Sequence, residues 1–115
     1  MPEQISRLLQ EYMLGIKQIY GDRLIAIILY GSYARNDFKE DSDQDIMILV
    51  DLSEEQIVST RAQLSEYTYE FNMQNDLNIR QIVKSEEHFN YWKAVYPFCK
   101  NVNREGIKIY ERRDE

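Results

Sequence analysis

Asp43 and Asp45 are separated by one residue, and this pair of carboxylates is the strongest candidate in the sequence for a catalytic or metal-binding site. In a strand, side chains at alternate positions point to one face, so we expect both carboxylates to project together, opposite Gln44. Two like charges about 5 Å apart repel by roughly 3 kcal/mol at an effective dielectric constant of about 20. A shared proton, exposure to water or a divalent cation would relieve this repulsion. Taken alone, the pair favours the ordinary alternative, a solvated acidic strand entry.

A short turn, Gly31-Ser32, ends an apolar run and is followed by ten residues before Asp43. Glycine permits a sharp turn and lets a ligand approach the backbone. Serine favours the N-cap of a helix, expected to begin near Tyr33, whose free N–H groups attract phosphate. An ordinary capped turn is the alternative for Gly-Ser alone. The combination of strand, Gly-Ser, ten residues, Asp-x-Asp and strand is far more specific, and it predicts one cleft that holds both features.

This combination resembles the signature of the DNA polymerase beta-like nucleotidyltransferase superfamily. The longer text GSYARNDFKEDSDQDIMILVD resembles its minimal nucleotidyltransferase (MNT) branch, many of whose members are antitoxins paired with a HEPN-domain toxin, and the tail YPFCKNVNREGIKIYE agrees. The resemblance implies that Gly31 and Ser32 contact nucleotide phosphates and that Asp43 and Asp45 bind Mg²⁺. Arg35, in the intervening segment, would steer a triphosphate or, equally, belong to a solvated loop.

Three positions depart from the family pattern. Asn36 stands where glycine is frequent, although asparagine tolerates positive φ, and Gln44 separates the aspartates where an apolar residue is frequent. The third departure matters more, because the next strand, read as Leu77–Val83, lacks the usual third acid. Arg80 falls at the expected position, and Asp76 is the nearest substitute. That acid commonly serves as base or second-metal ligand, so its loss leaves metal binding possible and puts catalytic rate in question.

Composition sets the class of protein. The 115 residues, 43% hydrophobic and 30% charged, predict one globular domain over residues 1–115, without room for a separate substrate domain. No apolar run approaches the ~20 residues of a membrane span, and the first residues have no secretory pattern. Cys99, the single cysteine, excludes an internal disulfide and fits a reducing cytoplasm. A net charge of −6 argues against an extended nucleic-acid interface but not against a nucleotide or a basic partner.

Hydrophobic periodicity predicts the elements that position these residues. Apolar residues at helical spacing indicate a helix over Pro2–Tyr20, stopped by Gly21. The nearly continuous apolar run Leu24–Tyr30 is typical of an interior strand covered on both faces. Later elements are expected in this order: a strand over about 44–50, a helix from the capping box at Ser53 to turn residues 72–76, an edge strand over 77–83, a helix from Ser85 whose face extends to Tyr96, a short helix from Pro97 to Gly106, and a short strand or edge contact at 107–110.

The alternation of expected helices and strands along the chain predicts a small α+β domain with a mixed sheet of three strands and packed helices. The strand order 1-2-3 is what the resemblance implies. It further implies transfer of AMP from ATP, with Mg²⁺, to a hydroxyl of a HEPN toxin, typically a tyrosine, which would silence the toxin. One alternative is a binding module with an idle site that neutralises such a partner by occlusion, as the missing third acid suggests. Another is nucleotidyl transfer to a small molecule such as an antibiotic, against which the lack of a second domain speaks.

Two further groups of residues invite a functional interpretation. Tyr91, Trp92, Tyr96 and Phe98 form a candidate partner surface, because tyrosine is enriched at protein interfaces, although ordinary packing is the alternative. His88 is the only histidine, and we expect it on a helix surface rather than as a catalytic base.

Overall fold

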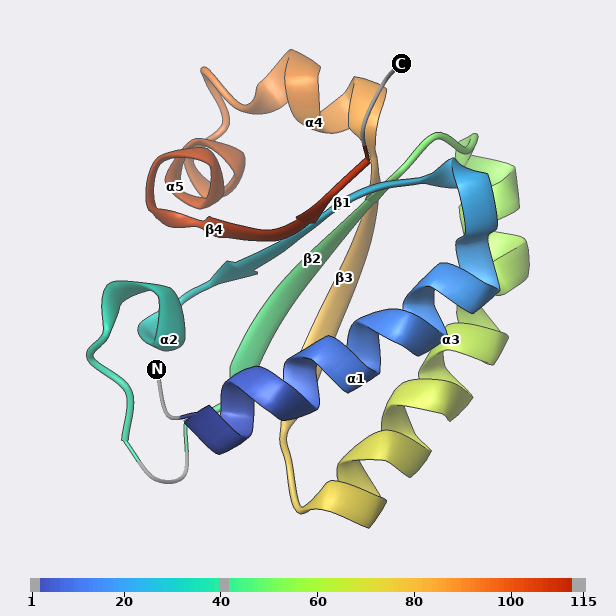
Figure 1. The fold of residues 1–115 in the computed structure, drawn as a ribbon. Helices are drawn as coiled ribbons and strands as arrows, with labels where there is room; N and C mark the ends of the chain where they lie inside the picture. Colours follow the sequence, from blue (N-terminus) through green and yellow to red (C-terminus); the bar gives the residue numbers. More distant parts are fainter. Residues whose placement is uncertain (1–2, 40–41, 113–115) are drawn as a thin grey trace.

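The computed structural model describes residues 3–39 and 42–112. Within them a four-stranded mixed sheet runs through the molecule, with helices on both faces (Figure 1). The strands are β1 (Leu24–Tyr30), β2 (Gln44–Val50), β3 (Ile79–Ser85) and β4 (Ile107–Glu111). The helices are α1 (Glu3–Tyr20), a 3-10 turn η1 (Gly21–Arg23), α2 (Ser32–Arg35), α3 (Glu54–Asn75), α4 (Glu86–Trp92) and α5 (Pro97–Glu105). The expected α+β class is confirmed.

The sheet has the order β3-β2-β1-β4. Strand β1 is antiparallel to both β2 and β4, whereas β2 and β3 are parallel. The expected order of the first three strands is therefore confirmed, but the expected three-stranded sheet is incomplete because β4 adds a fourth strand beside β1. A strand as apolar as β1 would otherwise leave a hydrophobic edge unpaired, which favours aggregation. With β4 in place, β1 is an interior strand and its first six residues are buried.

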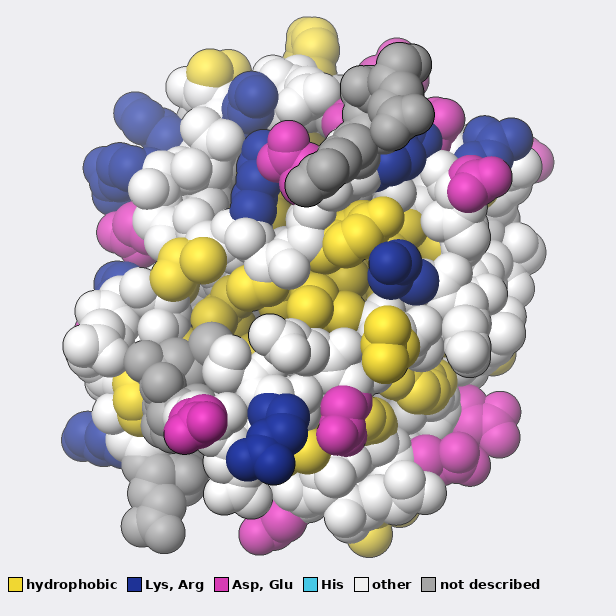
Figure 2. All heavy atoms as spheres, in the orientation of Figure 1, with side chains coloured by type: hydrophobic (Ala, Val, Ile, Leu, Met, Phe, Trp, Pro, Cys, Tyr) yellow, Lys and Arg dark blue, Asp and Glu magenta, His cyan; other side chains and the backbone are white. Residues whose placement is uncertain are grey.

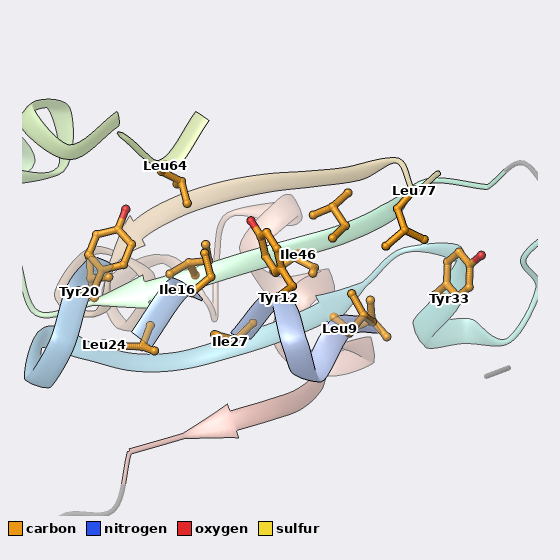
Figure 3. Close-up of a cluster of buried hydrophobic side chains, with 14 of the residues drawn as sticks. Leu9, Tyr12, Ile16, Tyr20, Leu24, Ile27, Tyr33, Ile46, Leu64 and Leu77 are labelled. Atoms are coloured by element: carbon orange, nitrogen blue, oxygen red, sulfur yellow. The ribbon is translucent and has the colours of Figure 1, made fainter. Parts of the chain in front are cut away.

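Each face of the sheet packs against its own helices (Figure 1). Helices α1 and α3 cover one face, where Leu24 and Ile27 of β1 meet Ile46 of β2 (Figure 3). Other residues of β1 and β2 point to the opposite face and pack against helices α4 and α5, and an irregularity in the pairing between Leu24 and Ala26 interrupts their alternation. This second cluster contains Ile25, Ala26, Ile28, Met47, Leu49, Phe89, Cys99 and Val102. The two-sided burial expected for β1 is confirmed, and Cys99 is a core residue.

Helices α1 and α3 are joined by tyrosines. The hydroxyl of Tyr12, which is fully buried, lies 2.7 Å from Thr68 Oγ1. The Tyr67 ring stacks on Tyr12 at 5.3 Å between centroids, and its hydroxyl donates to the Tyr12 carbonyl at 2.9 Å. Gly15 permits this approach, because a Cβ there would collide with the Tyr67 ring. The helices thus meet through a small residue and a buried polar pair.

The structure corrects two element boundaries. Strand β3 begins at Ile79 rather than Leu77, because Asp76 adopts a left-handed conformation at the end of α3 and the Leu77 N–H still bonds to the Asn72 carbonyl. Leu77 is buried within this turn, so its apolar character did not indicate a strand. Helix α4 ends at Trp92, and Tyr96 is exposed beyond it instead of continuing an inward helical face.

Figure 2 shows one face of the molecule, where hydrophobic side chains form a band over β1 between α1 and β4, with charged side chains around it. Ile109 and Tyr110 of β4 contribute to this side as partly buried residues packed on the core. Among the helices of the described residues, none is both long and apolar enough to cross a membrane.

Candidate active site

The turn after β1 lies at the centre of the candidate site. Gly31 has φ 76° and ψ −151°, a region that is essentially restricted to glycine. It is the N-cap of α2, whose first residue is Ser32, so the expected N-cap at Ser32 is wrong by one residue. Asn36 ends this short helix with φ 61°, the left-handed conformation that asparagine tolerates.

The two aspartates enter the same region from β2. Asp45 lies opposite Tyr30 in the antiparallel pairing with β1 and opposite Arg80 in the parallel pairing with β3. Asp43 immediately precedes the strand. Gln44 between them is 3% exposed and belongs to the other face, as the alternation of side chains along a strand requires. A Cβ atom on Gly31 would collide with Asp45 Oδ2, so turn and carboxylate are in direct contact.

One guanidinium bridges the two carboxylates. Arg80 Nη2 lies 2.8 Å from Asp45 Oδ1, and Arg80 Nε lies 3.0 Å from the same oxygen. Nε is also 3.2 Å from Asp43 Oδ2. The hydrogen bond and charge of Asp45, and then the charge of Asp43, raise the pKa of the Arg80 guanidinium. The position at which the family pattern places an acid thus holds a cation that contacts both aspartates.

These residues line an open groove of about 430 Å³, within the usual size range of small-ligand sites. Strand β1, helix α2 and the aspartate segment form one side, and α5 forms the other; the lining residues include Tyr30, Gly31, Ser32, Arg35, Ser42, Asp43, Asp45, Arg80, Phe98, Asn101 and Glu105. The candidate residues Gly31, Ser32, Arg35, Asp43 and Asp45 therefore lie around one opening. Only Asp76 of the predicted set is absent from this lining.

Arg35 of α2 lies across the groove mouth. Its Nε is 3.3 Å from Asp37 Oδ2, and its Nη1 is 3.7 Å from Glu105 Oε2 of α5. Both pairs are partly exposed, and exposed ion pairs contribute little free energy. Arg35 is therefore a groove cation that two carboxylates hold loosely, compatible with movement toward an entering anion.

Helix α5 supplies a wall of the groove that sequence reasoning missed. Phe98 packs edge-on against Tyr30 with ring centroids 5.6 Å apart. Burial, followed by the negative charge of Asp45, raises the pKa of the Tyr30 hydroxyl, and Arg80 partly offsets this. The only signal in the sequence was the aromatic character of Phe98, which suggested a partner surface rather than a groove wall.

The side-chain amides of buried Gln44 and half-buried Asn72 position the start of β3. Gln44 Oε1 accepts a hydrogen bond from the Asn78 N–H at 3.1 Å, and the Gln44 N–H donates to the Asn78 carbonyl at 3.1 Å. Asn72 Oδ1 accepts from the Ile79 N–H at 2.9 Å, and Asn72 Nδ2 donates to the Ile79 carbonyl at 3.1 Å. These bonds fix the backbone directly before Arg80. Glutamine between the aspartates, a departure from the family pattern, was the available signal.

The remaining candidates lie elsewhere. Asp76 occupies the left-handed position that ends α3, with φ 53°. Among the described residues there is no group of three or more histidine, cysteine, aspartate or glutamate side chains arranged to hold a metal. His88 is in α4, near the exposed Tyr91 and Trp92 and outside the groove.

The donor set fits a hard cation with few protein ligands. Mg²⁺ is commonly held by one or two carboxylates and completes its shell with water and phosphate oxygens. Asp43 and Asp45 each direct an oxygen at the same guanidinium, so their geometry already converges on one positive charge. Two carboxylates beside an open groove are therefore compatible with Mg²⁺ bound together with a phosphate ligand.

A family model described as "Polymerase beta, Nucleotidyltransferase" matches residues 3–115. The chain belongs to this family. The resemblance drawn from the Gly-Ser and Asp-x-Asp motifs is confirmed, and the protein is a nucleotidyltransferase.

Relatives and solved structures agree with this assignment. "Putative protein adenylyltransferase MJ0604" of Methanocaldococcus jannaschii is 35% identical over 105 residues, covering 91% of this chain and 97% of that relative. "Putative protein adenylyltransferase MJ0141" of the same organism is 31% identical over 107 residues, covering 92% and 99%.

A crystal structure of a "putative nucleotidyltransferase from Sulfolobus solfataricus" has a TM-score of 0.67 at 18% identity, covering 95% of this chain and 82% of that chain. A toxin-antitoxin structure with AMP-PNP has a TM-score of 0.58 at 18% identity, covering 90% and 74%. A MntA-HpeT toxin-antitoxin mutant has a TM-score of 0.55 at 16% identity, also covering 90% and 74%. The shared nucleotidyltransferase fold is confirmed.

Proposed function

We propose that this nucleotidyltransferase transfers AMP from ATP to a hydroxyl of a partner protein and that the partner is a HEPN-domain toxin. One observation carries the proposal: the glycine turn at Gly31 and the carboxylates of Asp43 and Asp45 share one groove. Relatives named as protein adenylyltransferases and structural neighbours that are toxin-antitoxin proteins support the choice of acceptor.

In this proposal the chain binds and orients the nucleotide. The N–H groups at the Gly31-Ser32 turn, together with the Ser32 hydroxyl and Arg35, contact the phosphates. Asp43 and Asp45 hold Mg²⁺, which when bound supplies positive charge to the triphosphate oxygens. The absence of a Cβ at Gly31 lets a phosphate approach the backbone beside Asp45. Phe98 and Asn101 of α5 border the opposite side and limit the orientations of the rest of the nucleotide.

The reaction then depends mainly on positioning. The acceptor oxygen forms a bond to the α-phosphorus, the bond to the pyrophosphate oxygen breaks in line, and the hydroxyl proton passes to water. Holding both reactants in the groove provides much of the acceleration, because orientation replaces a bimolecular encounter. Asp76 lies outside the groove lining, so we assign it no part in this step.

The test is the intact mass of the protein encoded beside this chain, co-expressed with wild type and with D43N/D45N. We expect whole AMP units on the partner with wild type and none with the double variant. D51N is the control, because Asp51 also forms an ion pair with an arginine but lies outside the groove, with Arg23 Nη1 3.7 Å from Asp51 Oδ2. An unmodified partner with wild-type protein and MgATP would overturn the proposal.

A second candidate function is a binding module that neutralises its partner by occlusion. Arg80 favours it, because a cation at the third position already forms ion pairs with both aspartates. The same variants separate the two functions when cell survival is measured in the presence of the toxin. Survival with D43N/D45N would support occlusion, whereas loss of protection with an intact complex would exclude it.

A further inference from the structure

We propose that Arg80 is an internal counter-ion that occupies the place of a divalent cation between Asp43 and Asp45, so that cation binding requires its guanidinium to leave. This inference rests on the cation site of the proposed function and adds a residue that regulates it. Arg80 Nη2 is 2.8 Å from Asp45 Oδ1, and Arg80 Nε is 3.2 Å from Asp43 Oδ2. A single positive group thus contacts the two carboxylates assigned to the cation.

Charge explains why the site needs such a counter-ion. Two carboxylates held on one side of a strand repel each other, and Asp45 is only 14% exposed, so water screens it poorly. A planar guanidinium can pair with more than one carboxylate at once, whereas an ammonium group acts as a point charge. Arg80 therefore offsets part of the negative charge of the pair in the cation-free protein and must compete with any cation that binds there.

The Arg80 guanidinium can move away from the two carboxylates although the backbone around Arg80 is fixed. The Asn78 N–H donates to Gln44 Oε1 and the Ile79 N–H donates to Asn72 Oδ1, which holds the residues just before Arg80. The Arg80 side chain, by contrast, is 65% exposed and lies at the edge of the sheet, on β3. Rotation of the side chain into solvent therefore opens the carboxylates without any change in the strand pairing.

The experiment measures the affinity for Mn²⁺, used as a spectroscopic substitute for Mg²⁺, by electron paramagnetic resonance of the free ion. We expect R80Q to bind Mn²⁺ about tenfold more tightly than wild type, because a competing positive charge is removed. R80K should fall between the two, since a lysine keeps the charge but not the planar fork. R23Q is the matched control, since Arg23 is also an exposed arginine paired with an aspartate, and its affinity should equal wild type.

The outcomes separate the inference from the function on which it rests. If wild type and R80Q bind Mn²⁺ equally and D43N/D45N does not bind it, Arg80 does not compete with the cation, although Asp43 and Asp45 do form the cation site. Weaker binding in R80Q would also overturn it. Absence of Mn²⁺ binding in both wild type and R80Q would overturn the cation site and the counter-ion together. Circular dichroism of each variant establishes that it is folded.

Discussion

Gly31 and Asp45 lie so close together on one side of the groove that a Cβ atom on the glycine would collide with Asp45 Oδ2. Because Gly31 also has φ 76° and ψ −151°, its backbone conformation and its surroundings both exclude a side chain. The turn that ends β1 and the carboxylate on β2 therefore form one unit, and a change at either residue should disturb the other.

G31A should lower the free energy of unfolding by about 3 kcal/mol and reduce nucleotidyl transfer about a hundredfold, through backbone strain and displacement of Asp45. Urea denaturation and the partner's mass measure the two effects. G21A is the control, because Gly21 has φ 57° and a Cβ added there would meet nothing within 4 Å. It should cost about 1 kcal/mol and leave transfer unchanged; similar transfer rates for G31A and G21A would contradict the proposed contact.

Q44M should weaken the attachment of the start of β3 to β2, although the backbone hydrogen bond from Gln44 to Asn78 remains. The Asn78 N–H would lose its acceptor in a partly buried setting, which costs about 1–3 kcal/mol. Faster hydrogen exchange of the Asn78 amide and a lower urea midpoint would measure this. Q56M is the control, since Gln56 also accepts from a backbone N–H, that of exposed Ser53; it should leave exchange at Asn78 unchanged. Unaltered exchange in Q44M would exclude the positioning role of Gln44.

Tyr12 and Thr68 should be energetically coupled, because their hydroxyls form a buried hydrogen bond of 2.7 Å between α1 and α3. Y12F and T68V each leave one buried polar group without its partner, whereas the double variant removes both. Urea denaturation of the four proteins should give a coupling free energy of about 1 kcal/mol, with the double variant less destabilised than the sum of the single variants. Additive losses would show that the hydroxyls do not interact.

Alkaline pH should destabilise the fold. Burial is the main cause that raises the pKa of Tyr12, Tyr20, Tyr30 and Tyr67 above 10.0 in the folded protein. The unfolded chain releases these protons near pH 10 while the folded chain keeps them, so stability is complete below that pH and falls above it. The fully buried Tyr12 contributes a slope that approaches about 1.4 kcal/mol per pH unit above pH 10.

Urea midpoints between about pH 8 and about pH 11 measure this slope. Y12F should make it shallower, because Tyr12 is fully buried, whereas Y69F, at an exposed position, serves as the control. An equal slope in wild type and Y12F would show that Tyr12 has the same pKa in the folded and unfolded proteins, which would contradict the prediction.

The effect of G15A on the free energy of unfolding should depend on the residue at position 67, with opposite signs in wild type and in a Y67A background. Alanine favours a helix by about 1 kcal/mol over glycine, but a Cβ at Gly15 collides with the Tyr67 ring. In wild type the overlap should win and G15A should destabilise by about 1 kcal/mol. In a Y67A background the same change should stabilise by about 1 kcal/mol. Thermal unfolding of the four proteins measures the difference, and destabilisation in both backgrounds would contradict the contact.

Local sequence patterns predicted the central elements because those patterns depend on near neighbours. The apolar run Leu24–Tyr30 matches β1, and the capping box at Ser53 is present with both hydrogen bonds. Leu77 was misassigned because burial in a turn and burial in a strand select the same side chain. The pairing of β4 with β1 was left open, since that choice depends on a long-range contact that no local pattern specifies.

In the candidate site, too, local sequence patterns predicted some features, whereas others depend on contacts between distant parts of the chain. The alternation of Asp43, Gln44 and Asp45 could be predicted because strand geometry fixes it. The contacts of Arg80 with both aspartates required the parallel register of β2 and β3, in which Asp45 lies opposite Arg80. Similarly, the wall provided by Phe98 depends on how α5 packs against the sheet, which the helical pattern of α5 does not contain.

The last strand borders the first. Because β4 (Ile107–Glu111) pairs with β1 (Leu24–Tyr30), one edge of β1 stays unpaired while the intervening residues are being synthesised. A nascent chain in which α5 (Pro97–Glu105) has not yet been translated also lacks the α5 side of the groove. The nascent protein therefore exposes an apolar strand edge until β4 has been translated, and its groove is completed only once α5 has been translated.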